Sequence, residues 1–261
     1  MPTKLPSVST FSSPSVIFDG DSSKNPTQAA VFWLRRDIVR GVFIPGERLK
    51  VDALAQFYGL GMSPIREAIL ILSDSGLVEH EHQRGYRVAP VSVEDYEDTL
   101  EIYHRVRRLA LEMAMERADD AWEEQVVIKL HRSMKVPVVG PDADPEAREQ
   151  WQRAYVSLQA ALVSGCRSPL LERLYRDVGS RIERYGNLFA DYTTDLTRDH
   201  RSEQWQIIDA MTSRSPAKLQ SLLDAFGAAA QPVRDSALIN LKIWLQDPSK
   251  PPRNAKMDEP I

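Results

Sequence analysis

Apolar residues recur with a helical period along most of the chain. In residues 27–90 they form three short helical stretches, followed by two strand-like runs around Gln83-Arg84-Gly85 that are typical of a β-hairpin. Each predicted helix stops at a glycine, the residue that most easily adopts the left-handed conformation found after helix ends. These glycines are Gly41, Gly59 and Gly76. Three short helices and a hairpin wing predict a winged helix-turn-helix domain.

The starts of these helices are predicted from capping residues. Thr27 is the expected N-cap of the first helix, and Asp52 or a near neighbour caps the second. The third helix is expected to begin at Ser63-Pro64, because serine is a good N-cap and proline suits the first helical position. Its core-facing positions follow the i, i+3, i+4, i+7 pattern. They are Ile65, Ala68, Ile69 and Leu72.

After a linker at Ala89-Pro90-Val91, Ser92 is expected to cap a long helix, and only helical patterns follow. They lie near 120–135, 146–165, 168–190, 198–212 and 216–228. The predicted fold is therefore mainly α: a winged helix-turn-helix joined to an all-α helical bundle. We expect a disordered N-terminal arm, the winged domain, the helical domain, and a C-terminal helix with a frayed tail. Their ranges are 1–26, 27–90, 91–230 and 231–261.

Composition supports a globular protein of two modest domains, with 261 residues of which 43% are hydrophobic and 27% charged. No apolar run approaches the roughly 20 residues that span a bilayer, and no export signal is evident, so we expect a cytoplasmic protein. The single cysteine, Cys166, cannot form an intrachain disulfide. Residues 27–90 carry eight Lys or Arg against seven Asp or Glu, although the whole chain has a formal charge of −4. This asymmetry agrees weakly with a DNA-facing first domain.

The first domain resembles the GntR family of bacterial regulators over most of residues 34–92. The residues that carry this resemblance lie at the turns, the second and third helices and the hairpin. They are Gly41, Pro45-Gly46-Glu47-Arg48-Leu49, Leu54-Ala55, Gly59, Ser63-Pro64-Ile65-Arg66-Glu67-Ala68, Gly76-Leu77-Val78 and Arg84-Gly85. The second domain more loosely resembles the FCD effector domain, named for the fatty-acid-regulator branch, over about residues 92–230. Its matching residues are Tyr103, Arg108, Glu112, Cys166-Arg167-Ser168-Pro169-Leu170-Leu171, Leu174-Tyr175 and Arg184-Tyr185.

The resemblance implies that the third helix enters the major groove of DNA. Arg66 is then the expected guanine-reading residue, flanked by Ser63 and by Met62, where the family often has arginine. At the wing, Arg84 and Gly85 are expected at the DNA backbone or minor groove. Two weaker phosphate candidates are Arg48 and Arg36. For each arginine, the alternative is a solvated surface residue.

Many FCD domains bind a divalent metal through one Asp and three His. The corresponding positions here are Tyr155, Gln159, Gln204 and Phe226, none of them a usual ligand, so we expect no metal cofactor. The resemblance instead makes Arg108 the candidate anchor for the carboxylate of a small organic acid, with those four residues completing the effector pocket. The alternative is that Arg108 pairs with an internal carboxylate such as Glu112 and the glutamines face solvent. The other histidines, His104, His131 and His200, show no ligand-like pairing.

These features predict a homodimeric regulator, in the first instance a repressor, that binds a pseudo-palindromic DNA operator and responds to a small organic acid. One alternative is a DNA-binding dimer without an effector, in which the helical domain only dimerises. Another is an enzyme with an accessory DNA-binding-like domain. The chain shows no phosphate-binding loop, dinucleotide fingerprint, nucleophile elbow or HExxH zinc motif, so the enzyme alternative has no catalytic residues to support it.

Overall fold

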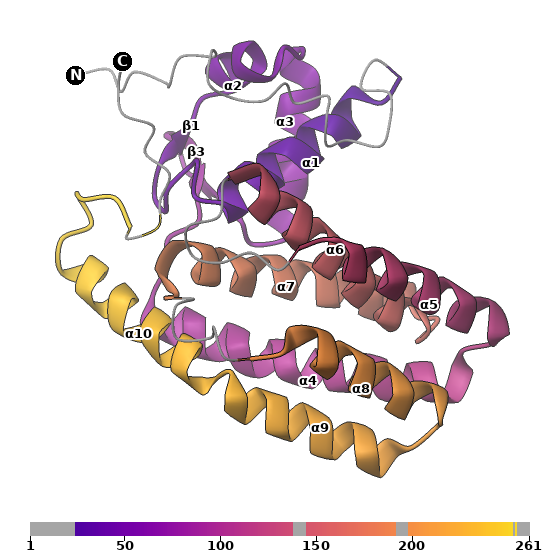
Figure 1. Cartoon of the computed structure of the whole chain (residues 1–261). Coiled ribbons are helices and arrows are strands. Elements are labelled where there is room, and N and C mark those ends of the chain that lie inside the picture. Colours follow the sequence, from indigo (N-terminus) through magenta and orange to yellow (C-terminus); the bar gives the residue numbers. More distant parts are fainter. Residues whose placement is uncertain (1–23, 138–144, 192–197, 253, 255–261) are drawn as a thin grey trace. The chain divides into compact units, whose positions relative to one another are not determined.

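The computed structural model describes residues 24–137, 145–191, 198–252 and 254. In that part of the chain it contains ten helices and one small antiparallel sheet (Figure 1). The first elements are α1 (Pro26–Val39), β1 (Arg48–Leu49), α2 (Val51–Tyr58), α3 (Met62–Asp74), β2 (Val78–Glu81) and β3 (Gly85–Val88). The helices that follow are α4 (Val93–Arg117), α5 (Asp120–Lys135), α6 (Pro145–Ser164), α7 (Pro169–Phe189), α8 (His200–Thr212), α9 (Pro216–Ala229) and α10 (Gln231–Gln246).

The chain divides into two compact units. The first contains the elements up to the start of α4, together with residues 180–189 of α7 and the chain from residue 240 onward. The second contains residues 97–179 and 190–239. Helices α4, α7 and α10 therefore each contribute to both units. No described helix is both long and apolar enough to cross a membrane.

The first unit has the predicted winged helix-turn-helix architecture, with α1 and α3 packed against each other and the hairpin β2–β3 beside them. The four predicted core positions of α3 are all completely buried. The sheet has the order β1-β3-β2, with Val78 opposite Val88 and Arg48 opposite Arg87. Strand β1 was not expected from the sequence, because two residues are too short to show an alternating pattern and their partner lies almost forty positions away.

The caps predicted for the first two helices are wrong. Helix α1 is capped by Asn25, whose side chain accepts a hydrogen bond from the backbone N of Gln28 at 3.1 Å, and not by Thr27. The chain therefore becomes helical at Pro26, inside the range expected to be a disordered arm; residues 1–23 lie outside the described residues. Helix α2 starts after Lys50, which makes no side-chain cap, while Asp52 lies in the first turn. There the carboxylate still favours the helix by opposing its dipole.

The linker after the wing is held by the second half of α7. Ser92 caps α4 as predicted, accepting a hydrogen bond from the N of Asp95 at 3.0 Å. Arg184, which is 1% exposed, donates to the carbonyls of Ala89 at 2.9 Å and Pro90 at 3.3 Å. The hydroxyl of Tyr185 donates to Asp95 Oδ2 at 2.6 Å. The motif Arg184-Tyr185 thus fixes the path of the chain where the winged domain ends.

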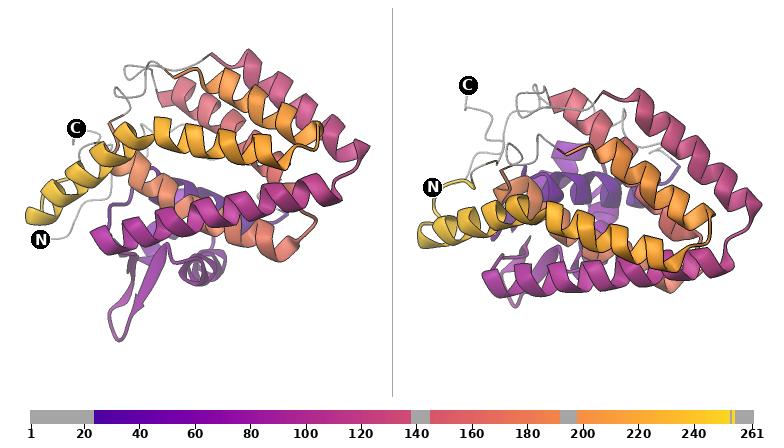
Figure 2. Two further views of the ribbon diagram at one scale, coloured as in Figure 1. Left: turned by 90° about the horizontal axis from the view of Figure 1, so that it is seen from below. Right: turned by 60° about the horizontal axis from the view of Figure 1, so that its bottom comes forward.

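The second unit is built entirely from helices in its described part, as predicted, and these run lengthwise beside one another (Figure 2). Its core includes Trp122 of α5, whose indole nitrogen donates to the carbonyl of Ala161 on α6 at 2.8 Å. Gly165 is required here, since an added Cβ would lie only 2.7 Å from the Trp122 indole nitrogen. Close packing of α5 on α6 therefore sets the position of the α6 side chains that face inward.

Candidate DNA-binding surface and effector site

Helix α3 presents one face to the core and the other to solvent. It follows α2 after Gly59, which has the left-handed φ of +65° that permits the sharp turn. With the apolar face buried, the residues at the opposite positions are exposed. They are Met62, Ser63, Arg66, Glu67, Leu70 and Ile71. The sequence-predicted DNA-contacting residues of α3 therefore all lie on its solvent face.

The sequence predicted Ser63 as the N-cap of α3, but Ser63 does not cap this helix. The helix begins one residue earlier, at Met62, and its N-cap is Gly61. The Ser63 hydroxyl instead donates to Glu67 Oε1 at 3.4 Å, and the hydroxyl of Thr27 on α1 donates to Glu67 Oε2 at 2.9 Å. Glu67 therefore ties the exposed edge of α3 to the start of α1, a role that sequence reasoning missed.

Three of the predicted DNA-contacting arginines are exposed: Arg66 on α3, Arg48 on β1 and Arg84 in the wing. Within the described part of the chain, none of them has an ion pair or a side-chain hydrogen bond. The wing turns through Gln83 and Gly85, whose φ angles of 62° and 86° are both left-handed. Glycine adopts this conformation without steric cost, and without a side chain its backbone can approach a phosphate.

Arg36, the other predicted phosphate contact, has a different environment. Its Nε lies 2.6 Å from Oδ1 of Asp37, which is only 3% exposed, and Tyr58 donates to the second carboxylate oxygen at 2.7 Å. Burial, followed by the Asp37 charge, raises the pKa of Tyr58 well above its usual range, so the phenol remains a donor. Arg36 therefore balances a buried carboxylate, and we no longer assign it to DNA.

In the second unit, two of the predicted effector residues meet at an arginine that the sequence analysis had not selected. Gln159 on α6 is 5% exposed, and its Oε1 accepts a hydrogen bond from Arg107 Nη2 at 3.2 Å. Tyr155 lies one turn earlier on α6 and interacts electrostatically with the guanidinium of Arg107. Burial raises the pKa of Tyr155 to about 12, so its hydroxyl stays neutral. Arg107, and not Arg108, is the cation beside these two residues.

Two further tyrosines complete this group. Tyr103 on α4 and Tyr175 on α7 stack with ring centroids 5.6 Å apart, and their hydroxyls are 3.3 Å apart. Both lie within electrostatic range of Arg107. We call this group the arginine–tyrosine cluster. It consists of Tyr103, Arg107, Tyr155, Gln159 and Tyr175. Tyr103 was detectable in the sequence because it lies one turn from Arg107 on α4, and Tyr175 because it belongs to the Leu174-Tyr175 motif of α7.

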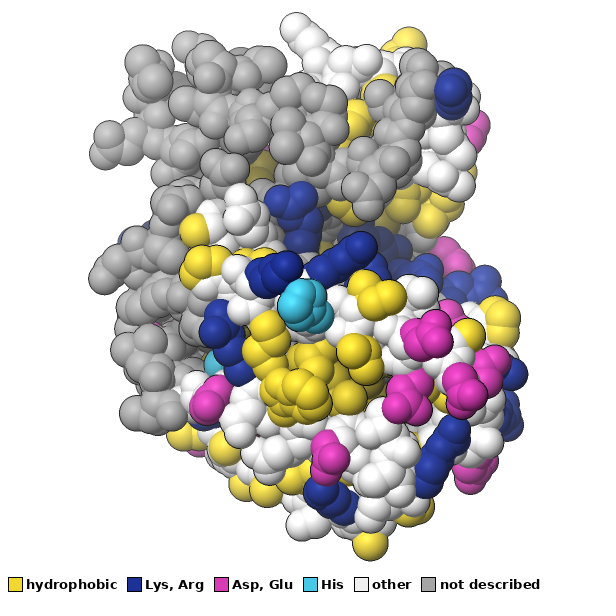
Figure 3. All heavy atoms as spheres, turned by 45° about the vertical axis from the view of Figure 1, so that its right-hand side comes forward, with side chains coloured by type: hydrophobic (Ala, Val, Ile, Leu, Met, Phe, Trp, Pro, Cys, Tyr) yellow, Lys and Arg dark blue, Asp and Glu magenta, His cyan; other side chains and the backbone are white. Residues whose placement is uncertain are grey.

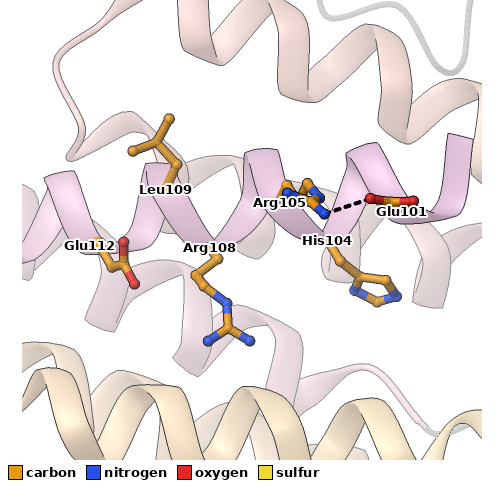
Figure 4. Close-up of a pocket in the computed structure, with 6 residues that line it drawn as sticks. All are labelled: Glu101, His104, Arg105, Arg108, Leu109 and Glu112. Atoms are coloured by element: carbon orange, nitrogen blue, oxygen red, sulfur yellow. Dashed lines mark ion pairs between the residues drawn. The ribbon is translucent and has the colours of Figure 1, made fainter. Parts of the chain in front are cut away.

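Arg108 lies one position further along α4 and has a different partner. It forms an ion pair with Asp224 of α9 at 2.6 Å, with 36% of its side chain exposed. This agrees with the alternative of an internal carboxylate partner, although the partner is Asp224 and not Glu112. It also lines an open hollow of about 400 Å³ on α4. Figure 4 shows Arg108 on the same side of α4 as His104 and Glu112, pointing toward a neighbouring helix. The predicted anchor is therefore already neutralised at the surface.

The other two predicted effector residues, Gln204 and Phe226, have no described hydrogen bond or ion pair to Arg107. Gln204 on α8 is buried, and Phe226 on α9 packs against the hydrophobic core of the second unit. No contact in the described part of the chain joins either residue to Arg107. Their neighbour Glu203 does lie within electrostatic range of Arg107, and it is paired with Arg198 at 2.6 Å. Tyr155 and Gln159 thus both lie beside Arg107, whereas Gln204 and Phe226 have no hydrogen bond or ion pair to it among the described residues.

The cluster does not suit a divalent metal. The Gln159 oxygen that would be the ligand already accepts a hydrogen bond from the cationic Arg107, and a second cation there would be repelled. Tyr155 is held in its neutral form, although a metal would require the phenolate. Among the described residues, no three His, Cys, Asp or Glu side chains are grouped to hold a metal. We therefore assign no metal chemistry to this unit.

His104 gives the second unit a predicted pH dependence. Its Nε2 accepts a hydrogen bond from Arg234 at 3.1 Å, because a guanidinium only donates. Desolvation, then the charges of Arg234, Arg107 and Arg108, lower its pKa from 6.5 to about 4. Between these values the unfolded chain binds more protons than the folded one, so stability falls as pH drops from 6.5 to 4. We expect His104→Gln to lose less stability over this range in urea unfolding; equal losses would contradict the assignment.

Comparison with known proteins agrees with both units. Residues 26–88 match "Bacterial regulatory proteins, gntR family", and residues 98–228 match "FCD domain". The chain is 28% identical to the HTH-type transcriptional repressor GlaR of Escherichia coli (strain K12), over 73% of this chain and 87% of that protein.

Two solved structures share the fold. E. coli McbR/YncC superposes with a TM-score of 0.60 at 16% identity, over 84% of this chain and 97% of the other. A regulator from Rhodococcus sp. RHA1 gives 0.58 at 23% identity, over 79% and 97%. The two domain matches, with this fold, are decisive: the chain belongs to the GntR family of bacterial regulatory proteins, carries an FCD domain, and is a transcriptional regulator and not an enzyme.

Proposed function

We propose that this regulator is a homodimeric repressor whose affinity for a DNA operator changes when a small organic acid binds at the arginine–tyrosine cluster. The observation that carries the proposal is the contrast between two sets of arginines. Arg48, Arg66 and Arg84 are exposed around α3 and the wing, without intramolecular partners in the described residues. Arg107, by contrast, is directed at neutral polar groups inside the helical unit.

At the DNA end, Arg66 lies on the second turn of α3, where its guanidinium can bind guanine O6 and N7 bidentately. Ser63 and Met62 would lie beside it at the start of the helix. Arg48 suits a phosphate, because it lies at the outer edge of the sheet. Arg84 and Gly85 place the wing tip on the backbone or in the minor groove. In this arrangement α3 recognises the base sequence, while the wing and β1 contact the DNA backbone and position the domain.

At the effector end, Arg107 supplies a charge that the nearby side chains do not balance. Its Nε is buried and has no hydrogen-bond partner among the described residues. Glu203, an acidic group that acts electrostatically on Arg107, is already paired with Arg198. A carboxylate would satisfy the guanidinium fork, and the hydroxyls of Tyr103 and Tyr155 would donate to its oxygens. Because leaving a buried charge uncompensated is costly, the cluster favours an anionic ligand.

Helix α7 offers a continuous route between ligand and linker. Tyr175, in the cluster, and Arg184, at the linker carbonyls, belong to the same uninterrupted helix. A ligand that shifts this helix would change the hold on Ala89 and Pro90. Regulation requires that the ligand bind one arrangement of the DNA-binding units better than the other, since equal affinity would change nothing.

Exposed hydrophobic side chains provide candidate dimer surfaces. Helices α4 and α7 of the second unit, joined through Tyr103 and Tyr175, carry four of them: Ile102, Leu109, Leu170 and Leu174. Hydrophobic side chains also gather on the face shown in Figure 3. A two-fold dimer buries the same patch on both subunits, and most soluble oligomers have this symmetry.

Selection of DNA from a random duplex library tests the proposal. The full-length protein should enrich a short pseudo-palindrome, because two-fold protein symmetry imposes two-fold operator symmetry. The complex should contain two protein chains per duplex by mass measurement. An enriched site without two-fold symmetry, bound by one chain, would contradict the homodimer; no enrichment at all would contradict sequence-specific DNA binding.

A further inference from the structure

The exposed face of α3 contains a line of three side chains that extends past the residues considered so far. Met62, Arg66 and Leu70 follow one another at intervals of four, so they lie along one side of the helix. Met62 is 53% exposed and Leu70 is 56% exposed, both high values for apolar side chains. The line is therefore a cation between two apolar side chains, all three accessible from the same direction.

The parallel line on the same face is chemically different. Ser63 and Glu67 are also four apart, and Ser63 and Thr27 both donate hydrogen bonds to the Glu67 carboxylate. That second line is committed to contacts within the protein. The line of Met62, Arg66 and Leu70 makes no side-chain hydrogen bond or ion pair in the described part of the chain, which leaves it free for the groove.

Helix and DNA dimensions set the spacing of what this line can contact. Four residues of α-helix rise about 6 Å. Base pairs are about 3.4 Å apart, so side chains four residues apart reach bases roughly two steps apart when the helix follows the groove. The major groove offers only one apolar group to a hydrophobic side chain, the C5-methyl of thymine. An exposed Leu or Met is hydrated in free protein, and burying it against that methyl releases the water.

We propose that Leu70 is a specificity-determining residue: with Met62 it selects thymine about two base pairs to either side of the base pair read by Arg66. The inference rests on the proposed role of Arg66 and adds a residue, Leu70, to which neither the sequence motifs nor the resemblance gives a role. Arg66 alone would discriminate only weakly among the neighbouring base pairs, because its contacts are confined to one guanine. The two apolar side chains extend recognition to roughly five base pairs in each half-site.

Replacing thymine by deoxyuridine tests this directly, because the substitution removes only the methyl group. In the selected operator, each thymine is replaced in turn, in both half-sites, and the dissociation constant of the full-length protein is measured. Loss of one buried methyl should raise the dissociation constant about fourfold, so replacing the same thymine in both half-sites should raise it about 15-fold. We expect this effect at two positions, one on each side of the Arg66 base pair. Thymines elsewhere should change binding by less than about twofold.

Variants assign each position to its side chain. Leu70→Ala should bind the thymine and deoxyuridine operators equally at one of the two positions and keep the discrimination at the other. Met62→Ala should show the reverse. Ile71→Ala is the matched control, since Ile71 is 47% exposed on the same helix but lies off the line, and it should keep both. Circular dichroism checks that each variant folds.

The outcomes separate this inference from the proposed function. Failure to select any operator would refute sequence-specific binding itself. A selected operator with a guanine dependent on Arg66, but with no sensitivity to deoxyuridine around it, would refute the role of Leu70 and leave the proposed function standing. Equal loss of discrimination in Ile71→Ala would also refute it, because the effect would then not belong to the line of three side chains.

Discussion

Arg184→Ala is expected to destabilise the first unit by about 2–4 kcal/mol. The guanidinium donates to the carbonyls of Ala89 and Pro90, and removing it leaves both acceptors short of a partner in a buried place. It also deletes one of the largest fully buried side chains of the described structure. Each of these effects alone costs on the order of 1–3 kcal/mol, and they are only partly additive.

Urea unfolding, followed by tryptophan fluorescence, measures this loss, since Trp33 and Trp244 both lie in the first unit. Arg184→Lys should recover only part of the stability, because a compact ammonium keeps the charge but lacks the planar fork with which the guanidinium reaches both carbonyls. Arg173→Ala is the matched control: it lies on the same helix but is exposed, and its effect should stay within about 0.5 kcal/mol. If Arg184→Ala were as stable as this control, the hold on the linker would not matter energetically.

Arg107→Ala is expected to abolish the response to small carboxylic acids, whereas Arg108→Ala should retain it. The two arginines are adjacent in sequence and point in different directions, Arg107 to Gln159 and Arg108 to Asp224. A ligand at 100 times its dissociation constant stabilises the folded protein by about 2.7 kcal/mol, which a thermal-shift assay detects. The substitution would remove the charged half of the binding contact and so lose all of this stabilisation.

A panel of mono- and dicarboxylates, each at millimolar concentration, is the probe. We expect at least one to raise the melting temperature of the wild type and of Arg108→Ala, but none to raise that of Arg107→Ala. A panel without effect on the wild type would favour the regulator without an effector. A response lost in Arg108→Ala and kept in Arg107→Ala would return the anchor to the residue that the family resemblance first suggested.

The pair Arg107 and Arg108 also illustrates how far the sequence can determine the site. Consecutive residues on a helix point about 100° apart, so an error of one position exchanges interior for surface. Arg107 shares its side of α4 with Tyr103 and the fully buried Leu111, both four residues away, whereas Arg108 shares its side with His104 and Glu112. This one-turn pattern was present in the sequence, but the resemblance to a known anchor position outweighed it.

Periodicity predicted the elements better than it predicted their ends. The buried stripe of α3 and the cap at Ser92 follow from local chemistry, and both were correct. The caps at Thr27 and Ser63 failed, because both hydroxyls donate to Glu67. The Thr27 contact joins two helices forty residues apart in the chain, whereas Ser63 lies one turn before Glu67 on α3. Short strands depend in the same way on tertiary structure, and so does the burial of Asp37, which accepts a hydrogen bond from Tyr58 on another helix.

The central claim is that α3 reads the operator through Arg66, and the affinity of Arg66→Ala for the selected operator tests it most directly. Fluorescence anisotropy at fixed salt should show a loss of about 1–3 kcal/mol in each half-site, with relaxed preference at one base pair per half-site. Arg84→Ala should instead weaken binding evenly across sequences. An Arg66→Ala protein with unchanged affinity and an unchanged footprint would contradict the placement of α3 in the groove.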